Sequence, residues 1–430
     1  MEMTKTIYDS PEYKRSRAAY MAQCTFEYFV TILAGDAFLA KLLSEMGIKD
    51  STIGVISSFV SAAFLFQLVS LFLVQHIKNV KKTSTIFNTL SSFLFMCLYL
   101  LPFVPIGTGG RTAIVTAVIF AAYFLNYTVT SIIFKWGNSF VAPTKRGTYS
   151  AAKEMVSLVG GIVYTMVVGH VFDAYENSGN INGGFIFMAA SIFVITLLNF
   201  ISLLMIKGSD AVEKHKTVPF KEVIGNIMHN KNFTHVVVMI SAYEFARYMT
   251  IGFLGIYKTK ELMISVGTVQ IINMVANLSR FSFSMPFGKF ANRYGFTKGL
   301  EMGYAIAAAA FLVNIFCAPG TWWCIVIYTI LFNTSQAGIN QNQLNIVYSY
   351  VKTDYFVQAS AIKSSIGGII GFCSSLIGSR ILSAVQANGN TVFGIPMYGQ
   401  QLLSLISFTV MIGVILFVHF VVAKQKAMIQ

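Results

Sequence analysis

The chain has 430 residues, of which 55% are hydrophobic, 14% are aromatic and only 11% are charged. Soluble globular proteins carry about a quarter charged residues, so this composition excludes a soluble domain and indicates a polytopic membrane protein. The net charge of +14 does not indicate a nucleic-acid partner, because the basic residues gather in alternate loops, where they report membrane topology.

Twelve apolar runs are each long enough to cross a bilayer as a helix of roughly 20 residues. They cover 20–42, 52–75, 83–104, 112–137, 149–172, 184–206, 234–257, 266–287, 299–318, 322–348, 357–383 and 400–423. The runs predict an N-terminal bundle at 1–206, a linker at 207–232 and a C-terminal bundle at 233–430. Within the linker, Pro219 opens a segment with apolar residues at helical spacing, which predicts an amphipathic helix on the membrane surface.

Residues of the second half repeat those of the first half, at an offset of 217 positions near the start and of 207 positions later. The matches are Phe26-Glu27-Tyr28 with Tyr243-Glu244-Phe245, Asn126 with Asn333, Ser157 with Ser364, and Gly160-Gly161 with Gly367-Gly368. Two homologous halves account for both offsets. The predicted fold class is therefore an all-α membrane protein with twelve transmembrane helices in two pseudo-symmetric six-helix bundles.

The distribution of basic residues predicts the orientation in the membrane. The two termini and the loops on their side hold 20 Lys and Arg residues, against 5 in the opposite loops. Cytoplasmic loops carry the excess of basic residues in membrane proteins. Both termini are therefore expected in the cytoplasm.

A polar loop at 288–298 separates the eighth and ninth runs, and a degenerate copy at 71–82 keeps its basic end. The spacing of glycine, basic and amide residues resembles the loop signature of the major facilitator superfamily, although Asn292 stands where the family has Asp. The resemblance implies the twelve-helix fold, secondary transport and a role for both loops as conformational gates. The expected gate residues are Gly288, Asn292, Arg293 and Gly295 in the loop, and Gln75, His76 and Lys78 in its copy.

Ionisable side chains inside apolar runs are candidates for function, because inserting one into a bilayer costs about 2.5 to 3.5 kcal/mol. The candidates are Glu27, Asp36, Lys135, Lys153, Glu154, Glu244, Arg247, Arg280 and Lys363. Three of them, Asp36, Arg280 and Lys363, are expected to have structural or snorkelling roles. The candidates for proton coupling are Glu27, Glu244 and Glu154.

The resemblance implies that the first, fourth, seventh and tenth helices line a central cavity. The polar and aromatic residues expected there are Glu27, Lys135, Trp136, Glu244, Arg247, Asn340, Gln341 and Gln343. We expect Glu27 to pair with Lys135, and Glu244 with Arg247 three positions later. Alternatively, these pairs are structural locks between helices. Successive helical residues turn by roughly 100°, so the amides from Asn340 to Gln343 cannot all face one way, and some should bond to neighbouring helices.

These features predict a secondary active transporter that moves a small organic solute by alternating access, with the proton as the expected coupling ion and Na⁺ as the alternative. The amides and aromatic side chains slightly favour import of a polar, sugar-like solute. Export of drugs or amphipathic compounds is an alternative, although the fifth helix lacks the Gly-Pro pair usual in drug-proton antiporters of the superfamily. A receptor or scaffold on the same fold is a more remote alternative.

The sequence has no Walker-type phosphate loop, no nucleophile elbow and no cluster of His and Cys at metal-binding spacing. The protein is therefore not expected to be an enzyme or to need a cofactor or a metal. Its expected partners are the solute, the coupling ion and the lipid bilayer, without nucleic acid, and it is expected to be a monomer. The short loops favour the inner membrane of a bacterium.

Overall fold

The computed structural model describes residues 8–69, 79–142, 146–208, 230–351 and 356–425. The chain divides into two compact units. We call them the first unit (Met1–Ile48 with Phe66–Lys216) and the second unit (Lys49–Leu65 with Thr217–Gln430). The beginning of the second apolar run therefore belongs to the second unit. The expected amphipathic helix at 219–228 lies outside the described residues, and the division into bundles at the linker stays a prediction.

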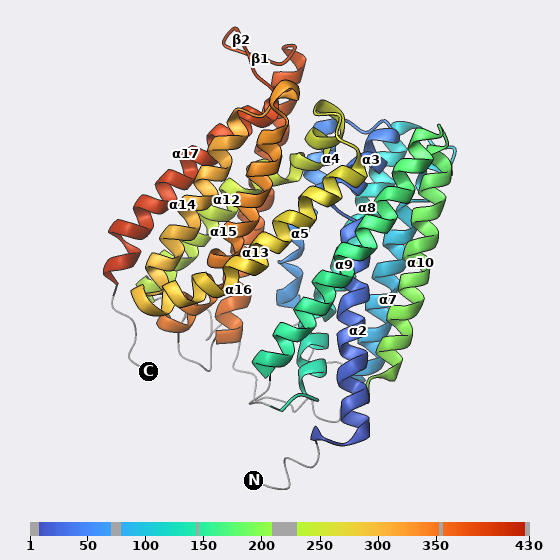
Figure 1. Ribbon diagram of the computed structural model, residues 1–430, viewed down its shortest axis with the longest axis vertical. Coiled ribbons are helices and arrows are strands. Elements are labelled where there is room, and N and C mark those ends of the chain that lie inside the picture. The colour runs from blue at the N-terminus through green and yellow to red at the C-terminus, as the bar shows by residue number, and fades with distance from the viewer. Residues whose placement is uncertain (1–7, 70–78, 143–145, 209–229, 352–355, 426–430) are drawn as a thin grey trace. The chain divides into compact units, whose positions relative to one another are not determined.

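The first unit consists of long helices that run alongside one another (Figure 1). They are α2 (Pro11–Leu33), α3 (Asp36–Glu45), α7 (Val80–Leu98), α8 (Thr108–Asn138), α9 (Arg146–Asn177) and α10 (Ile181–Met205), with a short η1 (Leu101–Phe103). Helix α2 begins where Ser10 caps it, since the Ser10 hydroxyl accepts a bond from the Tyr13 amide. The prediction of one continuous helix over 20–42 is wrong, because Ala34 and Gly35 separate α2 from α3.

The second unit contains the remaining helices and a small hairpin (Figure 1). Its helices are α4 (Asp50–Ser57), α5 (Phe59–Ala63), α12 (Lys231–Ile256), α13 (Val266–Tyr294), α14 (Phe296–Ile315), α15 (Trp323–Tyr350), α16 (Phe356–Ala387) and α17 (Gly399–Phe420). Short helices η3 (Tyr257–Glu261), η4 (Pro319–Thr321) and η6 (Val422–Lys424) end or link them, and β1 (Thr391–Val392) pairs antiparallel with β2 (Ile395–Pro396). Buried aromatic residues such as Tyr304, Phe311 and Tyr328 fill the core between α12, α14 and α15.

The loop between α13 and α14 is much shorter than the predicted 288–298. Helix α13 continues to Tyr294, and α14 begins at Phe296, so that Gly295 alone separates them. Gly295 has φ 95°, a backbone conformation that glycine adopts without the penalty of a Cβ atom. The polar residues from 288 to 294 thus extend the helix instead of ending it.

Eight helices in the described part of the chain are long and apolar enough to cross a membrane. They correspond to the second, fourth, fifth, sixth, seventh, ninth, eleventh and twelfth predicted runs. The other four runs form α2 with α3, α7, α13 and α15. These four carry more polar side chains, and three of them contribute to the polar clusters described below.

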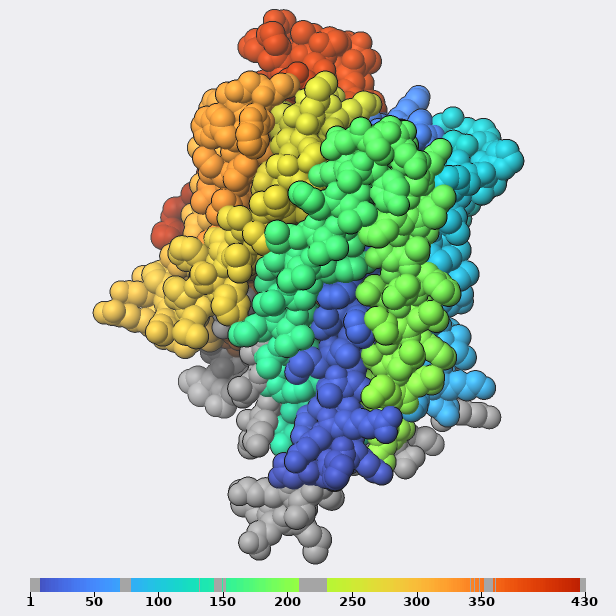
Figure 2. Space-filling view, turned by 45° about the vertical axis from the view of Figure 1, so that its right-hand side comes forward, coloured from blue at the N-terminus to red at the C-terminus, as the bar shows by residue number. Residues whose placement is uncertain are grey.

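Helices α9 and α10 lie side by side on one face of the first unit (Figure 2). Both helices expose apolar side chains at helical spacing: Val159, Val163 and Val167 on α9, and Ile186, Val194 and Ile201 on α10. Such a face would be unfavourable in water but fits the hydrocarbon of a bilayer. The outer surface of the unit is therefore suited to contact with lipid.

Candidate functional site

A polar cluster surrounds Glu27 on α2. The side chain of Glu27 is half-buried. Gln23 lies one turn earlier, is fully buried, and donates a hydrogen bond from Nε2 to Glu27 Oε2 over 2.7 Å. The spacing of four residues places both side chains on one face of the helix. A neutral donor therefore holds the carboxylate in position.

Among the described residues, Lys153 of α9 is the cation that interacts with Glu27. Its ammonium lies 4.9 Å from the ring centroid of Tyr20 and 5.5 Å from that of Phe134, distances at which aromatic faces attract a cation. The predicted pairing of Glu27 with Lys135 is wrong. Its side chain is exposed near the end of α8, and no ion pair joins it to Glu27 among the described residues.

Asparagine side chains from two further helices complete the cluster. Asn126 of α8 faces Glu27, and its Oδ1 accepts a bond from Thr130 over 2.7 Å, which leaves the amide nitrogen for the carboxylate. Asn88 of α7 also lies close to Glu27, and its Oδ1 accepts a bond from Asn199 of α10 over 2.7 Å. Residues from four helices thus meet at one carboxylate, and α10 is connected to them through Asn199.

Two other predicted residues of the first unit lie apart from this cluster. Trp136 is fully buried in the hydrophobic core and donates from Nε1 to the carbonyl oxygen of Lys207 over 3.0 Å. Glu154 follows Lys153 on α9, but its side chain is exposed. Successive helical residues differ in direction by about 100°, so Lys153 can face α2 while Glu154 turns away.

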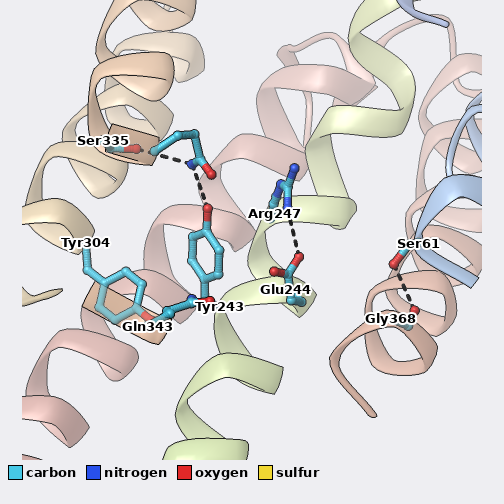
Figure 3. Close-up of polar contacts among 9 residues, drawn as sticks. Ser61, Tyr243, Glu244, Arg247, Tyr304, Ser335, Gln343 and Gly368 are labelled. Atoms are coloured by element: carbon cyan, nitrogen blue, oxygen red, sulfur yellow. Dashed lines mark hydrogen bonds and ion pairs between the residues drawn. The ribbon is translucent and has the colours of Figure 1, made fainter. Parts of the chain in front are cut away.

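A second cluster, in the second unit, forms around Glu244 on α12 (Figure 3). The predicted pairing with Arg247 is confirmed: Arg247 Nη1 donates to Glu244 Oε2 over 3.2 Å. The carboxylate side chain is 15% exposed and that of the arginine 27%. Lys363 of α16 also interacts with the Glu244 carboxylate. Two basic side chains, Arg247 and Lys363, therefore lie beside one carboxylate.

Hydrogen bonds of tyrosine side chains continue this second cluster toward α14 and α15 (Figure 3). Tyr243 accepts a bond from Gln336 Nε2 over 2.7 Å, and Tyr304 accepts one from Gln343 Nε2 over 3.2 Å. The two tyrosine rings lie 5.2 Å apart between centroids. These amide and hydroxyl groups are buried and bonded to one another, and they link α12, α14 and α15 beside the Glu244–Arg247 pair.

The amide run on α15 faces several directions, as expected. Asn340 is exposed, whereas Asn342 is buried and donates to the carbonyl oxygen of Gly338 over 2.8 Å. Gln343 bonds to Tyr304 of the neighbouring helix α14, which confirms that part of the run connects helices. The side chain of Gln341 lies outside the described residues.

The predicted gate residues near the end of α13 lie mostly on the surface. Asn292, Arg293 and Gly295 are exposed, and Gly288 is half-buried. The Arg293 guanidinium lies 5.2 Å from the ring centroid of its neighbour Tyr294. The corresponding residues Gln75, His76 and Lys78 lie outside the described part of the chain, so the gating role of both segments stays a prediction.

The position of Lys153 beside α2 was not predicted, although its spacing along α9 indicates it. Lys153, Ser157, Gly160 and Tyr164 follow one another at three or four residues and lie on one face of α9. Ser157 Oγ is 3.0 Å from Thr25 Oγ1, and the Tyr164 ring stacks on Phe29, both on α2. A lysine in register with these contact residues must face α2.

Solved structures with the same fold are membrane transporters. A mutant of the nucleoside transporter NupG matches with a TM-score of 0.72 and 14% identity, over 94% of this chain and 98% of that chain. A bacterial homologue of the human lysosomal transporter Spinster, inward-facing and unoccupied, matches with a TM-score of 0.62 and 14% identity, over 96% of both chains. A bacterial metal transporter matches at 0.63 and 9% identity, over 97% of this chain and 99% of that chain.

These structures confirm the predicted fold of twelve transmembrane helices in two six-helix bundles. No curated protein sequence matches the chain significantly. The family model described as MFS/sugar transport protein matches residues 83–352, which is more than half of the chain. The chain therefore belongs to the MFS/sugar transport protein family and is a multi-span membrane transporter of the major facilitator type.

Proposed function

We propose that the protein imports a small, polar, sugar-like solute together with protons, by alternating access of its two six-helix bundles. The observation that carries this proposal is a repeated arrangement of charges. Glu27 and Glu244 lie at matching positions on the first helix of each half, and each interacts with a lysine, Lys153 or Lys363, on the fifth helix of its own half.

This arrangement can couple protonation to movement. An ionised carboxylate in a region of low dielectric is stabilised by a nearby cation. When a proton neutralises the carboxylate, the lysine loses its partner and becomes available to the solute or to another helix. Proton binding would thereby change the free-energy difference between two conformations of each bundle, which is the requirement for coupling.

Two further observations support a polar solute. The partly exposed side chains of Glu244 and Arg247 lie beside buried amide and tyrosine groups. A group that hydrogen-bonds a hydroxyl discriminates strongly against ligands that lack it. The family model is described by sugar transport, and NupG is a nucleoside transporter. Sugars and nucleosides are therefore the first solutes to test.

The decisive experiment is uptake of labelled sugars and nucleosides into proteoliposomes with an imposed inward proton gradient. We expect the gradient to accelerate uptake by the parent protein. The variants Glu27→Gln and Glu244→Gln should retain solute exchange without a gradient but lose the acceleration. Glu301→Gln, which alters a carboxylate paired with His419 on the surface, is the matched control and should behave as the parent.

The outcomes separate the alternatives. If the proton gradient still accelerates uptake in both glutamine variants, the coupling role of Glu27 and Glu244 is contradicted. Glu154 is then the next candidate, and Glu154→Gln is the corresponding test. Acceleration by a sodium gradient alone would replace the proton as the coupling ion. Binding of amphipathic cations without any sugar or nucleoside would favour the exporter.

We further propose that the protein is a monomer in a bacterial inner membrane, with both termini in the cytoplasm. The excess of Lys and Arg in the loops on the side of the termini, 20 against 5, supports this orientation.

A further inference from the structure

Arg247 of α12 carries a guanidinium group that is only partly bonded. Its Nη1 donates to Glu244 Oε2 over 3.2 Å (Figure 3). Its Nε is buried and has no hydrogen-bond partner among the described residues. Within that part of the chain, Glu244 is the one group to which Arg247 donates. An arginine offers five N–H donors, so most of its capacity for hydrogen bonds is unused.

The free donors of Arg247 share one edge of the guanidinium group. Nε and Nη2 each direct one N–H outward from this edge, in the parallel arrangement that binds a carboxylate with two hydrogen bonds. Glu244 bonds to Nη1, on the other side of the group, and leaves the edge open. Cζ of Arg247 lies 5.1 Å from the ring centroid of the buried Tyr248, which restricts the orientation of the group. Because a buried donor without a partner is costly, a planar group with two acceptor oxygens would be stabilised at this edge.

The position of Arg247 suits contact with a solute. The side chains of Arg247 and Glu244 are partly exposed, and both lie within a helix that is apolar enough to span the membrane. Tyr243 is buried, bonds to Gln336 of α15, and lies on a different side of α12 (Figure 3). Solute sites of secondary transporters lie near the middle of the bilayer, where such a pair can be reached.

Glu244 has to serve more than one basic side chain. It is the single acidic residue in the sequences of the described helices α12, α13, α15, α16 and α17. Lys363 of α16 interacts with the same carboxylate. Gly367, one turn later on α16, also lies beside it, since a Cβ atom there would be 3.3 Å from Glu244 Cγ. A guanidinium group stays protonated in proteins, so a second carboxylate would supply the acceptor oxygens that Glu244 does not.

We propose that the open edge of Arg247 binds a carboxylate group of the transported solute, which is then a polyhydroxylated carboxylate and not a neutral sugar. This inference rests on the proposed function and narrows its class of solutes. Two parallel, charge-assisted hydrogen bonds from Nε and Nη2 would hold the carboxylate. A phosphate monoester is a poorer match, because it carries about −1.5 to −2 charges and three acceptor oxygens, against one positive charge and two donors at this edge.

Equilibrium binding of gluconate to the purified protein in detergent tests the proposal. Glucitol is the matched neutral compound, because it carries a hydroxymethyl group in place of the carboxylate. We expect gluconate to bind roughly tenfold more tightly than glucitol or glucose 6-phosphate. Arg247→Gln should abolish the preference for gluconate over glucitol, and Arg247→Lys, which keeps the charge but loses the fork, should weaken it. Arg380→Gln removes an exposed guanidinium group from α16, and this control should bind as the parent.

A second variant predicts a change of opposite sign. Glu244→Gln leaves Arg247 without an anionic partner, so this variant should bind gluconate more tightly than the parent, which misfolding cannot produce. Melting temperatures without ligand show whether each variant folds. Weaker gluconate binding by Glu244→Gln, or a gluconate preference that survives in Arg247→Gln, would overturn the proposal.

The remaining outcomes separate this proposal from the proposed function. Equal affinity for gluconate and glucitol, or tighter binding of glucose 6-phosphate than of gluconate, would refute the carboxylate site. Both results would leave proton-coupled uptake of a sugar-like solute intact, because the measurement involves no proton gradient. Binding of neither gluconate nor any sugar or nucleoside would refute the proposed function as well.

Discussion

Lys81 illustrates how a single side chain can complete a helix end. It is the second residue of α7, and its Nζ donates to the carbonyl oxygens of Leu204 and Ile206, over 2.7 Å in each case, at the end of α10. The last carbonyl groups of a helix have no partner within the helix and carry its negative dipole end. Partial burial lowers the pKa of the Lys81 ammonium. The basic end of the predicted gate loop therefore has a structural role.

Replacing this lysine should destabilise the protein. We expect Lys81→Met to lower the free energy of unfolding by about 1 kcal/mol, because two charge-assisted hydrogen bonds are lost while the side chain keeps much of its apolar contact. Thermal unfolding in detergent is the measurement. Lys82→Met, at the exposed next position, is the control and should leave the melting temperature unchanged. Equal effects of the two changes would contradict the capping role.

The candidate site was predictable from the sequence only in part. Glu27 and Glu244 were identified because an ionisable group in an apolar run is costly and therefore unusual. Their partners were harder to predict. Arg247 lies three residues from Glu244 on one helix, where the spacing alone requires proximity. Lys153 reaches Glu27 from another helix, and the choice between Lys135 and Lys153 depends on how α8 and α9 are rotated.

At the scale of elements, glycines allow α4 and α12 to cross closely within the second unit. A Cβ atom on Gly252 would lie 2.1 Å from Ser58 Oγ and 2.6 Å from the backbone oxygen of Gly54. A Cβ atom on Gly54 would lie 1.9 Å from the ring of Phe253. Small residues at helix crossings are the usual means of close packing in membranes.

Adding a methyl group at this helix crossing should destabilise the protein, whereas adding one at a glycine without close neighbours should not. Gly252→Ala should lower the free energy of unfolding by about 1 to 3 kcal/mol, because the backbone of α4 cannot move aside without repacking. Gly413→Ala, on α17 with nothing within 4 Å of the added atom, should be neutral or stabilise by up to about 1 kcal/mol. Melting temperatures of both variants give the comparison. A stable Gly252→Ala variant would show that the two helices do not approach this closely.

Predicted helix ends were less accurate than predicted helices. Each of the twelve apolar runs corresponds to helical structure in the described residues. The break at Ala34 and Gly35 and the extension of α13 to Tyr294 were not predicted. The length of an apolar run matches the thickness of the membrane. A helix can nevertheless bend within the membrane or continue beyond it, and local hydrogen bonding decides which occurs.

For the whole molecule, the distribution of charge makes the orientation testable. In a variant without native cysteines, Phe393→Cys lies in the hairpin of β1 and β2 and is fully exposed, while Lys298→Cys lies near the start of α14 on the side expected in the cytoplasm. An impermeant maleimide should label the first in intact cells and the second only after permeabilisation. The reverse pattern would contradict the proposed topology.

The sequence by itself determined the class of the protein, its twelve helices, its internal repeat and its resemblance to the major facilitator superfamily. These features follow from rules that act locally along the chain, because a bilayer requires long apolar runs and makes each buried charge costly. The positions of Glu27 and Glu244 follow from the same rules.

Only the tertiary structure decided which side chains meet. It placed Trp136 in the core, turned Lys153 and not Glu154 toward α2, and brought Asp50, Glu261 and Gln400 together at one pocket. These contacts join positions about 70 to more than 300 residues apart in the sequence. Each step of one residue along a helix rotates the side chain by about 100°. Neither the rotation of a helix nor its neighbours can be derived from the apolar runs alone.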